Sequence, residues 1–223
     1  MKGLKNTIRI NPYLRWLLVF SNWLSQGIIH ADKTEKIYKI LFSTVSSLIF
    51  FFIFIAYFKI SLGKSILAGV FLGHTLSWVI NGNFNVIVVH RLFLSNLDRQ
   101  NAFHYLESLA DRLNGNQSIL YATTHGSICT GNLKPSSDID VALVRAKGFK
   151  NALRALFFVT REKKIADLKG IPLEIYLIDN PGAAIDRFQA EQNPVVIYDP
   201  KNTVDQYYRE KMTIAEARKL NGL

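Results

Sequence analysis

Cysteine is almost missing from this chain: Cys129 is the single cysteine among 223 residues. One cysteine cannot build an internal disulfide framework, and it cannot supply a zinc site that needs several thiolates. Charged residues make up 20% of the chain and aromatic residues 12%, a composition that excludes a disordered chain. This length has room for one ordinary domain, or for a small domain with an appendage.

Acidic residues are scarce in the first half of the chain. Residues 1–99 carry 11 basic and 3 acidic side chains, whereas residues 100–223 carry 16 and 14. The net charge of +10 therefore comes mainly from the half that is also the more apolar. This combination points to a membrane surface as the partner before it points to nucleic acid. The second half is nearly balanced in charge and has no stacking motif, which also argues against nucleic acid.

No charged residue occurs between Lys39 and Lys59. As a helix, residues 40–58 span roughly 28 Å, close to the hydrocarbon thickness of a bilayer. Apolar residues lie on every face of this helix, and a small soluble domain cannot cover them all. The stretch also begins too late, and lacks the small-residue cleavage pattern, for a signal peptide. We therefore predict that it spans a membrane, in preference to being a buried core helix.

A second uncharged stretch, residues 65–90, follows after a short turn. Asparagines interrupt it from Asn81 onward, and unpaired amides are costly in lipid. The second span is therefore predicted over about 65–82, with continuation beyond Asn81 inside a bundle as the alternative. Together the two spans predict a transmembrane helical hairpin within residues 38–90.

The segment 1–37 is predicted to be basic and amphipathic, and to lie at the membrane surface. Within it, residues 11–30 combine leucines with Arg15, two tryptophans and polar amides, as expected of a helix in the bilayer plane; a third span is the alternative. Seven basic residues precede the first span, whereas the turn offers only Lys59 and Lys64, so the N-terminus is predicted to be cytoplasmic. Two spans return the chain to the same side, which predicts a multi-pass protein with a cytoplasmic C-terminal domain.

An amphipathic helix is predicted to connect the hairpin to the rest of the chain. It is assigned to residues 91–114, although its apolar spacing can be followed from about Val86. Residues 115–223 then form a separate domain. The candidate buried positions of the connecting helix are Val89, Leu92, Phe93, Leu97, Leu106 and Leu109.

The C-terminal domain alternates short β-rich runs with helical patterns. Strands are predicted over 118–123, 141–144, 172–179 and 193–200, and helices over 147–164 and 203–220. The first of these helices has an apolar stripe at Phe149, Leu153, Leu156 and Phe157. Its basic residues are interpreted as a solvated face, with contact to anionic lipid or an anionic acceptor as the alternative.

Two carboxylates lie close together where the chain enters the second predicted strand. Asp138 and Asp140 are two residues apart, so on an extended chain both side chains project from the same face. Carboxylates forced together repel each other unless a cation lies between them, and hard oxygen ligands favour Mg²⁺ over zinc. Glu174, on the third predicted strand, would complete a site for one or two metal ions. Asp179 is the alternative third acid.

A Gly-Ser turn precedes these acids, and the combination is more specific than the Asp pair. It resembles the DNA polymerase β-like nucleotidyltransferase superfamily, particularly its small single-domain members, whose pattern reads G-S-x-x-x-G and then S-D-x-D. The matching residues are Gly126, Ser127, Gly131, Ser137, Asp138 and Asp140. The resemblance covers roughly residues 105–200 and does not extend to the hairpin.

The resemblance implies an α+β fold, in which a small mixed β-sheet is flanked by helices and preceded here by the all-α transmembrane hairpin. It also implies that Asp138, Asp140 and Glu174 are catalytic and hold Mg²⁺, expected as two ions. In the superfamily these ions bridge the phosphates of a nucleoside triphosphate and stabilise in-line attack on its α-phosphate, with release of pyrophosphate.

The Gly-Ser turn is implied to bind the nucleotide, since its backbone N–H groups and the serine hydroxyl would cradle the triphosphate. Many relatives carry a basic residue between this turn and the next glycine, whereas this chain has Ile128, Cys129 and Thr130 there. Phosphate charge must then be met by Lys134 or by basic residues elsewhere. The expected nucleotide-binding residues are Gly126, Ser127, Gly131, Ser137 and Lys134.

The expected function is a membrane-anchored nucleotidyltransferase, which moves a nucleoside monophosphate from a nucleoside triphosphate to an acceptor hydroxyl or phosphate. A membrane anchor suits an acceptor that is a lipid, a lipid-linked glycan or a membrane protein. The alternative is a catalytically weak or inactive nucleotidyltransferase-like module, whose hairpin mediates homo-oligomerisation or docking to a membrane enzyme. An antitoxin-like role, modifying a soluble partner protein as small relatives do, fits less well with membrane spans.

Overall fold

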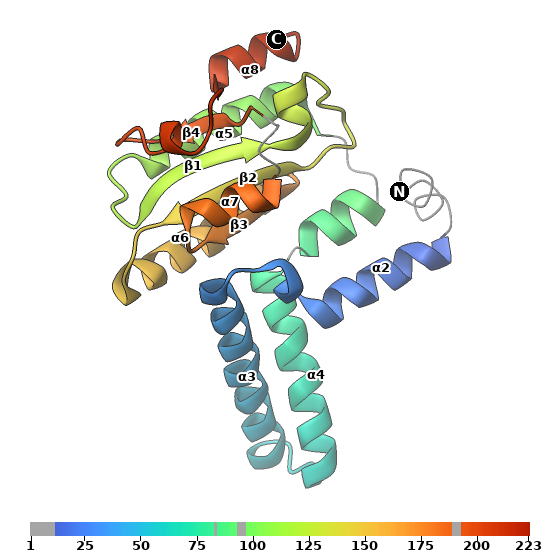
Figure 1. Cartoon of the computed structure of the whole chain (residues 1–223). Helices are drawn as coiled ribbons and strands as arrows, with labels where there is room; N and C mark the ends of the chain where they lie inside the picture. The colour runs from blue at the N-terminus through green and yellow to red at the C-terminus, as the bar shows by residue number, and fades with distance from the viewer. Residues whose placement is uncertain (1–11, 83, 93–96, 189–192) are drawn as a thin grey trace. The chain divides into compact units, whose positions relative to one another are not determined.

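The computed structural model describes residues 12–82, 84–92, 97–188 and 193–223. The chain divides into two compact units, Met1–Leu92 and Phe93–Leu223 (Figure 1). The first unit is helical throughout its described part, and the second combines helices with a five-stranded mixed sheet. The predicted α+β fold class with a mixed sheet is thereby confirmed.

The N-terminal unit is built around two long helices. Its elements are α2 (Pro12–Ser25), the 3₁₀ turn η1 (Ile28–His30), α3 (Lys33–Ala56), α4 (Leu62–Asn81) and the π-helix η2 (Asn85–Leu92). Helix α3 starts before the uncharged stretch and so takes in three lysines, whereas α4 ends among the asparagines. Both helices are long and apolar enough to cross a membrane.

Helices α3 and α4 run side by side (Figure 1), and glycines of α4 lie where the two backbones approach closely. A Cβ atom added at Gly73 would lie 2.2 Å from the backbone nitrogen of Ser47, and one at Gly69 would lie 2.9 Å from that of Phe51. Only glycine permits so close an approach of two helix backbones. Small residues four apart along a helix are typical of helix pairs that associate without a hydrophobic driving force.

Large apolar side chains cover the outer surface of this hairpin. On α3 they include Leu41, Val45, Leu48, Ile49, Phe52 and Ile53, and on α4 Ile66, Leu67, Val70 and Phe71, all of them exposed. The helices are therefore not the buried core of this unit. A continuous exposed apolar surface of this extent requires another apolar medium or partner to cover it.

A buried polar cluster joins the end of α2 to the hairpin. Gln26, 1% exposed, donates to His74 Nδ1 at 3.0 Å and to the His74 carbonyl oxygen at 2.8 Å. It accepts a hydrogen bond from Ser77 Oγ at 2.9 Å, and its carbonyl oxygen accepts one from Lys39 Nζ at 2.9 Å. Lys39 also pairs with Glu35 at 2.7 Å. Because buried polar groups are costly when unbonded, this network fixes where α2 ends.

The predicted connecting helix over 91–114 is not one element. Helix α5 (Arg99–Leu113) starts only after Asp98, whose backbone is extended and whose carboxylate accepts from Gln100 N at 3.0 Å. This is an N-cap, so the chain enters α5 from a non-helical segment. Of the candidate buried positions, Leu97, Leu106 and Leu109 are buried, whereas the side chains of Val89, Leu92 and Phe93 lie outside what the structure describes.

The C-terminal unit contains one five-stranded sheet in the order β3-β2-β1-β4-β5. Its strands are β1 (Ile119–His125), β2 (Ile139–Arg145), β3 (Leu173–Ile178), β4 (Val195–Tyr198) and β5 (Met212–Thr213). Strand β1 runs antiparallel to β2 and β4, while β2 and β3 are parallel. The first four strands agree with the prediction, and β5 is additional. Strand β2 starts two residues earlier than predicted and therefore includes Asp140.

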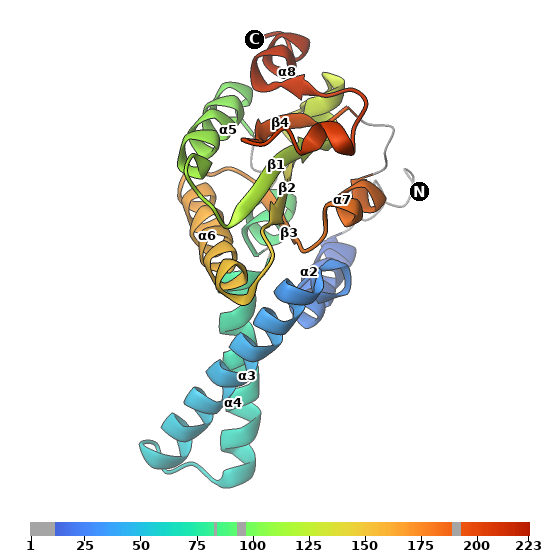
Figure 2. The ribbon, with the colours of Figure 1, turned by 60° about the vertical axis from the view of Figure 1, so that its left-hand side comes forward.

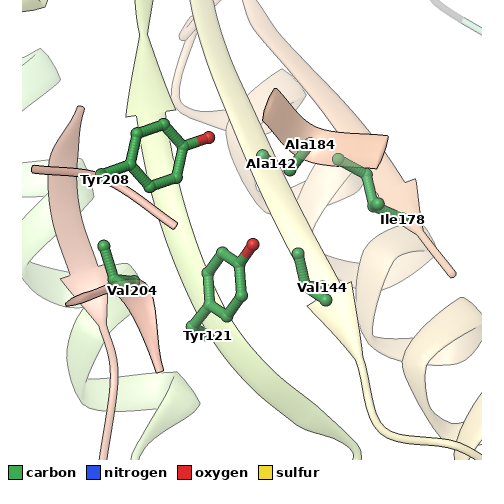
Figure 3. Close-up of a cluster of buried hydrophobic side chains, with 7 residues drawn as sticks. All are labelled: Tyr121, Ala142, Val144, Ile178, Ala184, Val204 and Tyr208. Atoms are coloured by element: carbon green, nitrogen blue, oxygen red, sulfur yellow. The ribbon is translucent and has the colours of Figure 1, made fainter. Parts of the chain in front are cut away.

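Helices cover both faces of the sheet. Figure 2 shows α5 and α6 (Phe149–Leu168) on one side and α7 (Pro181–Phe188) on the other. On the α7 side, Ala142 and Val144 of β2 pack with Ala184 of α7 in a buried cluster (Figure 3). Alternation along the strand turns Val141 and Leu143 to the opposite face, where they are also buried.

An ion pair ties α5 to α6. Arg112 donates to both carboxylate oxygens of Glu162, with Nη2 at 2.7 Å from Oε2 and Nε at 2.9 Å from Oε1. The hydroxyl of Tyr105 lies 3.3 Å from Glu162 Oε2. The Glu162 side chain is fully buried, so its carboxylate points into the unit and is neutralised there by Arg112.

The apolar stripe of α6 does not form its packed face. Of the four stripe residues only Leu156 is buried, whereas Phe149, Leu153 and Phe157 are exposed. The side facing the sheet consists largely of smaller residues: Ala152, Ala155, Leu156, Val159 and Ala166. Small side chains let the helix approach the sheet closely, and Phe158 is the one phenylalanine of α6 that is buried.

The prediction of one closing helix over 203–220 is wrong for the first half of that range. Only α8 (Ile214–Leu220) is an α-helix, preceded by the 3₁₀ turn η4 (Val204–Gln206) and by β5. The carboxylate of Asp199 accepts from the backbone nitrogens of Thr203 and Val204 at 2.9 and 2.8 Å, which holds this segment in a turn. Strand β5 then pairs with β4. The helical spacing of residues 203–220 did not predict this strand.

Candidate active site

The sheet topology brings the predicted acids to one edge. Because β2 and β3 are parallel and in register, Asp140 lies directly opposite Glu174. Directly opposed residues on neighbouring strands are about 4.8 Å apart at the backbone and project to the same face. Both residues are the second of their strand, so the two carboxylates meet at the edge where β2 and β3 begin.

Tyr176 lies on the same face, two residues after Glu174. Its hydroxyl donates to Glu174 Oε2 at 2.5 Å. Burial raises the pKa of this phenol, as do the charge of Glu174, the hydrogen bond to it, and the charges of Asp140 and Asp138. The phenol therefore keeps its proton near pH 7, and all three carboxylates lie close enough to act on it. Tyr176 was not predicted from the sequence, although strand alternation places it on the same face as Glu174.

The Gly-Ser turn lies beside the acids because β1 is antiparallel to β2. The last residue of β1, His125, lies opposite Asp140, and the 3₁₀ turn η3 (Gly126–Thr130) follows at once. Gly126 has a φ of 82°, and a Cβ atom there would lie 3.3 Å from Asp140 Oδ2. The left-handed backbone favours glycine here, and a Cβ atom would in addition crowd the Asp140 carboxylate by a few tenths of an ångström.

Gly131 has a packing role in this structure. Its φ is 69°, and an added Cβ atom would lie 2.8 Å from the carbonyl oxygen of Leu220, at the end of α8. Next to it, the buried Asn221 donates to Ile128 O at 2.9 Å and accepts from Leu133 N at 3.1 Å. The end of α8 therefore packs against the turn and hydrogen-bonds to it. The sequence pattern did not predict this contact.

The side chains of the turn offer little positive charge. Ile128 and Cys129 are buried and Thr130 is exposed and neutral. Burial raises the pKa of the Cys129 thiol to about 11, so this cysteine is a protonated packing group and not a nucleophile. The loop to β2 carries the exposed Lys134, whose backbone nitrogen donates to Ser137 Oγ at 3.0 Å.

The alternative third acid, Asp179, lies at the other end of the strands. It follows β3 and pairs with Arg145 Nε at 2.5 Å. Since Arg145 is the last residue of β2 and Asp140 is near its start, the structure brings Glu174, and not Asp179, next to the Asp pair.

His125 is buried beside the site and stacks on Phe188 of α7, with ring centroids 4.1 Å apart. Its Nε2 lies 3.0 Å from Thr123 Oγ1. Burial lowers the pKa of this imidazole to about 4, so His125 is neutral at pH 7. It is therefore a packing residue between β1 and α7 and brings no positive charge to the site.

The donor set fits a hard divalent cation in kind. Asp138, Asp140 and Glu174 offer carboxylate oxygens, which Mg²⁺ prefers. Within the described ranges, however, no three His, Cys, Asp or Glu side chains are gathered tightly enough to hold a metal ion as they stand. Binding an ion at this edge would require the carboxylates to turn toward a common point.

Comparison of the chain with protein-family models gives no match, and a search of curated proteins gives none at the threshold applied. What can be said of its chemistry therefore rests on the residues and their geometry.

Proposed function

We propose that this protein is a membrane-anchored nucleotidyltransferase, which transfers a nucleoside monophosphate from a nucleoside triphosphate to an acceptor hydroxyl or phosphate. One observation carries the proposal: Asp140 and Glu174 lie opposite each other on parallel strands, at the edge that the glycine turn at Gly126 also reaches. Acids at a strand edge beside a backbone turn suit the binding of a metal–triphosphate.

Each group of the proposed site has a role that follows from its chemistry. Asp138 and Asp140 would hold Mg²⁺, and Glu174 would complete the site or accept the proton of the acceptor. When bound, Mg²⁺ supplies positive charge to the phosphates and stabilises the charge that develops on the α-phosphate. The acceptor oxygen bonds to the α-phosphorus, the bond to the bridging oxygen of the β-phosphate breaks, and pyrophosphate leaves.

The hairpin supplies the membrane anchor in this proposal. Helices α3 and α4 have the length and composition of membrane spans, and their apolar side chains are exposed. With both ends of the hairpin on one side, the N-terminus and the sheet unit are cytoplasmic, as the basic flank before the first span favours. The acceptor then belongs to the membrane: a lipid, a lipid-linked glycan or a membrane protein.

The proposal is tested by transfer of label. Detergent-solubilised full chain is incubated with Mg²⁺, a membrane extract and each of the four nucleoside triphosphates labelled at the α-phosphate. Label is expected in one fraction only (lipid, protein or soluble), and expected to disappear in Asp140→Asn and Glu174→Gln. Asp111→Asn, which removes an exposed carboxylate of α5, is the matched control and is expected to transfer normally.

Two outcomes would contradict the proposal. If Asp140→Asn still transfers label, the active site does not include Asp140. No transfer with any nucleotide, from folded protein that binds nucleoside triphosphate in the presence of Mg²⁺, would exclude the enzyme and leave a binding protein.

The second candidate is a nucleotidyltransferase-like binding or assembly module. The observation that favours it is the turn itself, where Ile128, Cys129 and Thr130 provide no cationic side chain for the phosphates. This candidate predicts Mg²⁺-dependent nucleotide binding that is lost in Asp140→Asn, without release of pyrophosphate. Measuring pyrophosphate alongside binding separates the two functions.

A further inference from the structure

The outer face of α6 is the main exposed apolar surface of the sheet unit. Six large apolar side chains are exposed in the described part of this unit, and four of them are on α6. Phe149 is 80% exposed, Leu153 50%, Phe157 74% and Leu168 89%. The first three follow one another at intervals of four residues, so they form one row along the helix.

Basic side chains lie between and beside these apolar residues. Lys147, Lys150, Arg154 and Arg161 are all exposed, and no acidic side chain in the described ranges pairs with any of the four. The acids of α6 are engaged elsewhere: Glu162 is buried against Arg112, and Asp167 pairs with Lys164. The outer face is therefore strongly positive as well as apolar.

The same face borders an open cleft of about 520 Å³. On the α6 side the cleft is lined by Leu153, Arg154, Phe157 and Arg161, and on the other side by the polar turn 115–118 that leads into β1. Arg154 and Arg161 are seven residues apart, two helical turns, and so project in nearly the same direction. The cleft thus offers two guanidinium groups next to aromatic and aliphatic carbon.

We propose that this face of α6 binds the surface of an anionic phospholipid bilayer, with lipid phosphates at Arg154 and Arg161 and with Phe149, Leu153 and Phe157 in the headgroup–acyl boundary. A row of large apolar residues with basic residues beside it is what interfacial helices use. Each Lys or Arg near an anionic surface strengthens the attraction about fivefold.

The proposed hairpin makes this contact easy to reach. A chain already tethered to a bilayer meets that surface at high effective concentration, so a modest affinity suffices. The inference rests on the membrane anchoring proposed above and is independent of the catalytic proposal.

The test places a reporter on the face itself. In Leu153→Cys a polarity-sensitive dye is attached to the full chain, reconstituted in lipid nanodiscs of phosphatidylcholine alone or mixed with phosphatidylserine. Cys129 is buried, so protein without the new cysteine serves as the labelling blank, and unchanged shielding of Cys129 shows that each variant is folded. We expect a blue shift of emission in the phosphatidylserine discs, and its loss on adding salt.

Charge reversal provides the decisive comparison. Arg154→Glu/Arg161→Glu is expected to abolish the lipid-dependent shift of emission. The control Lys201→Glu/Lys219→Glu makes an equal charge change at exposed lysines elsewhere on the unit and is expected to retain the shift.

Equal emission in the two lipids, or equal loss of the shift in both variants, would overturn the proposal. A shift independent of lipid that grows with the number of chains per disc would assign the face to a second copy of the chain, and would equally overturn it. Nucleotide transfer is not measured, so the result does not depend on the catalytic proposal.

Discussion

At the scale of single residues, Tyr176 is the side chain that hydrogen-bonds the proposed third acid, Glu174. Its phenol donates to Glu174 at 2.5 Å, and its pKa is raised by burial and by all three carboxylates. A hydroxyl that keeps its proton next to a metal-binding carboxylate orients that carboxylate without competing for the ion. Tyr176 is thus a positioning residue for the proposed site.

Tyr176→Phe is therefore predicted to lower the affinity of the site for Mg²⁺ more than its affinity for nucleotide. The ring and its packing against Phe188 remain, while the bond to Glu174 is lost. Loss of such a second-layer hydrogen bond typically costs about 10- to 100-fold in metal affinity or activity. The measurement is transfer as a function of Mg²⁺ concentration, in which the half-maximal concentration should rise.

The control for this prediction is Tyr208→Phe. Tyr208 is buried on the same side of the sheet (Figure 3), and its hydroxyl has no hydrogen-bond partner among the described residues. Its removal should leave the Mg²⁺ dependence unchanged. An unchanged Mg²⁺ requirement in Tyr176→Phe as well would mean that Glu174 does not hold the ion.

The structure changes the explanation for glycine at position 126. A glycine was expected there so that a phosphate could approach the backbone. The structure shows a left-handed φ and the nearness of Asp140 Oδ2, both of which hold without any ligand. For Gly131 the neighbour is Leu220, more than eighty residues further along the chain, and no local pattern indicates such a contact.

At the scale of elements, the hairpin depends on how closely α3 and α4 approach. Gly73→Ala would put a methyl group 2.2 Å from the Ser47 nitrogen, so the helices must move apart. Gly63→Ala, in the same helix, meets nothing within 4 Å, and alanine there gains up to about 1 kcal/mol in helix propensity. Gly73→Ala is therefore predicted to destabilise the hairpin and Gly63→Ala to leave it intact or stabilise it.

The native tryptophans report this difference. Trp16, Trp23 and Trp78 all belong to the N-terminal unit, so their fluorescence follows the hairpin while the shielding of Cys129 follows the sheet unit. In a titration with denaturing detergent, the tryptophan transition of Gly73→Ala should occur earlier than that of Gly63→Ala. Coincident transitions would show that the two helices do not pack as described.

Helix α6 shows where sequence periodicity stops being informative. The apolar stripe and the helix were both recognised, but the stripe lies mostly outside and small residues face the sheet. A hydrophobic pattern gives the period of an element and not its direction. The direction in which the stripe points is decided by which side of the helix fits against the strands, and here three alanines and Phe158 are buried while Phe149 and Phe157 are exposed.

At the scale of the whole molecule, both chain termini are predicted to lie on the same side of the membrane. The argument is that two spans, and no third, return the chain to its starting side, and that basic residues favour the cytoplasm. Protease should remove an N-terminal and a C-terminal tag together in inside-out vesicles, and neither tag in right-side-out vesicles.

The turn between the spans provides the opposite readout. In Ser61→Cys, a membrane-impermeant thiol reagent should label only right-side-out vesicles, because Ser61 is exposed between α3 and α4 and Cys129 is buried. Tags on opposite sides would require an odd number of spans, and would move the sheet unit out of the cytoplasm.

Elements whose signal is local could be predicted from the sequence alone. Charge-free stretches and their length gave the two long helices, and alternation gave the first four strands. The acids Asp138 and Asp140 could be paired because they are two residues apart. The distant groups that lie beside them could be identified only from the packing of the strands. The parallel register of β2 and β3 places Glu174, and not Asp179, next to the pair, and Tyr176 lies on the same face as Glu174. Strand register and helix direction depend on packing between segments far apart in the chain, and that information is not present in any one of them.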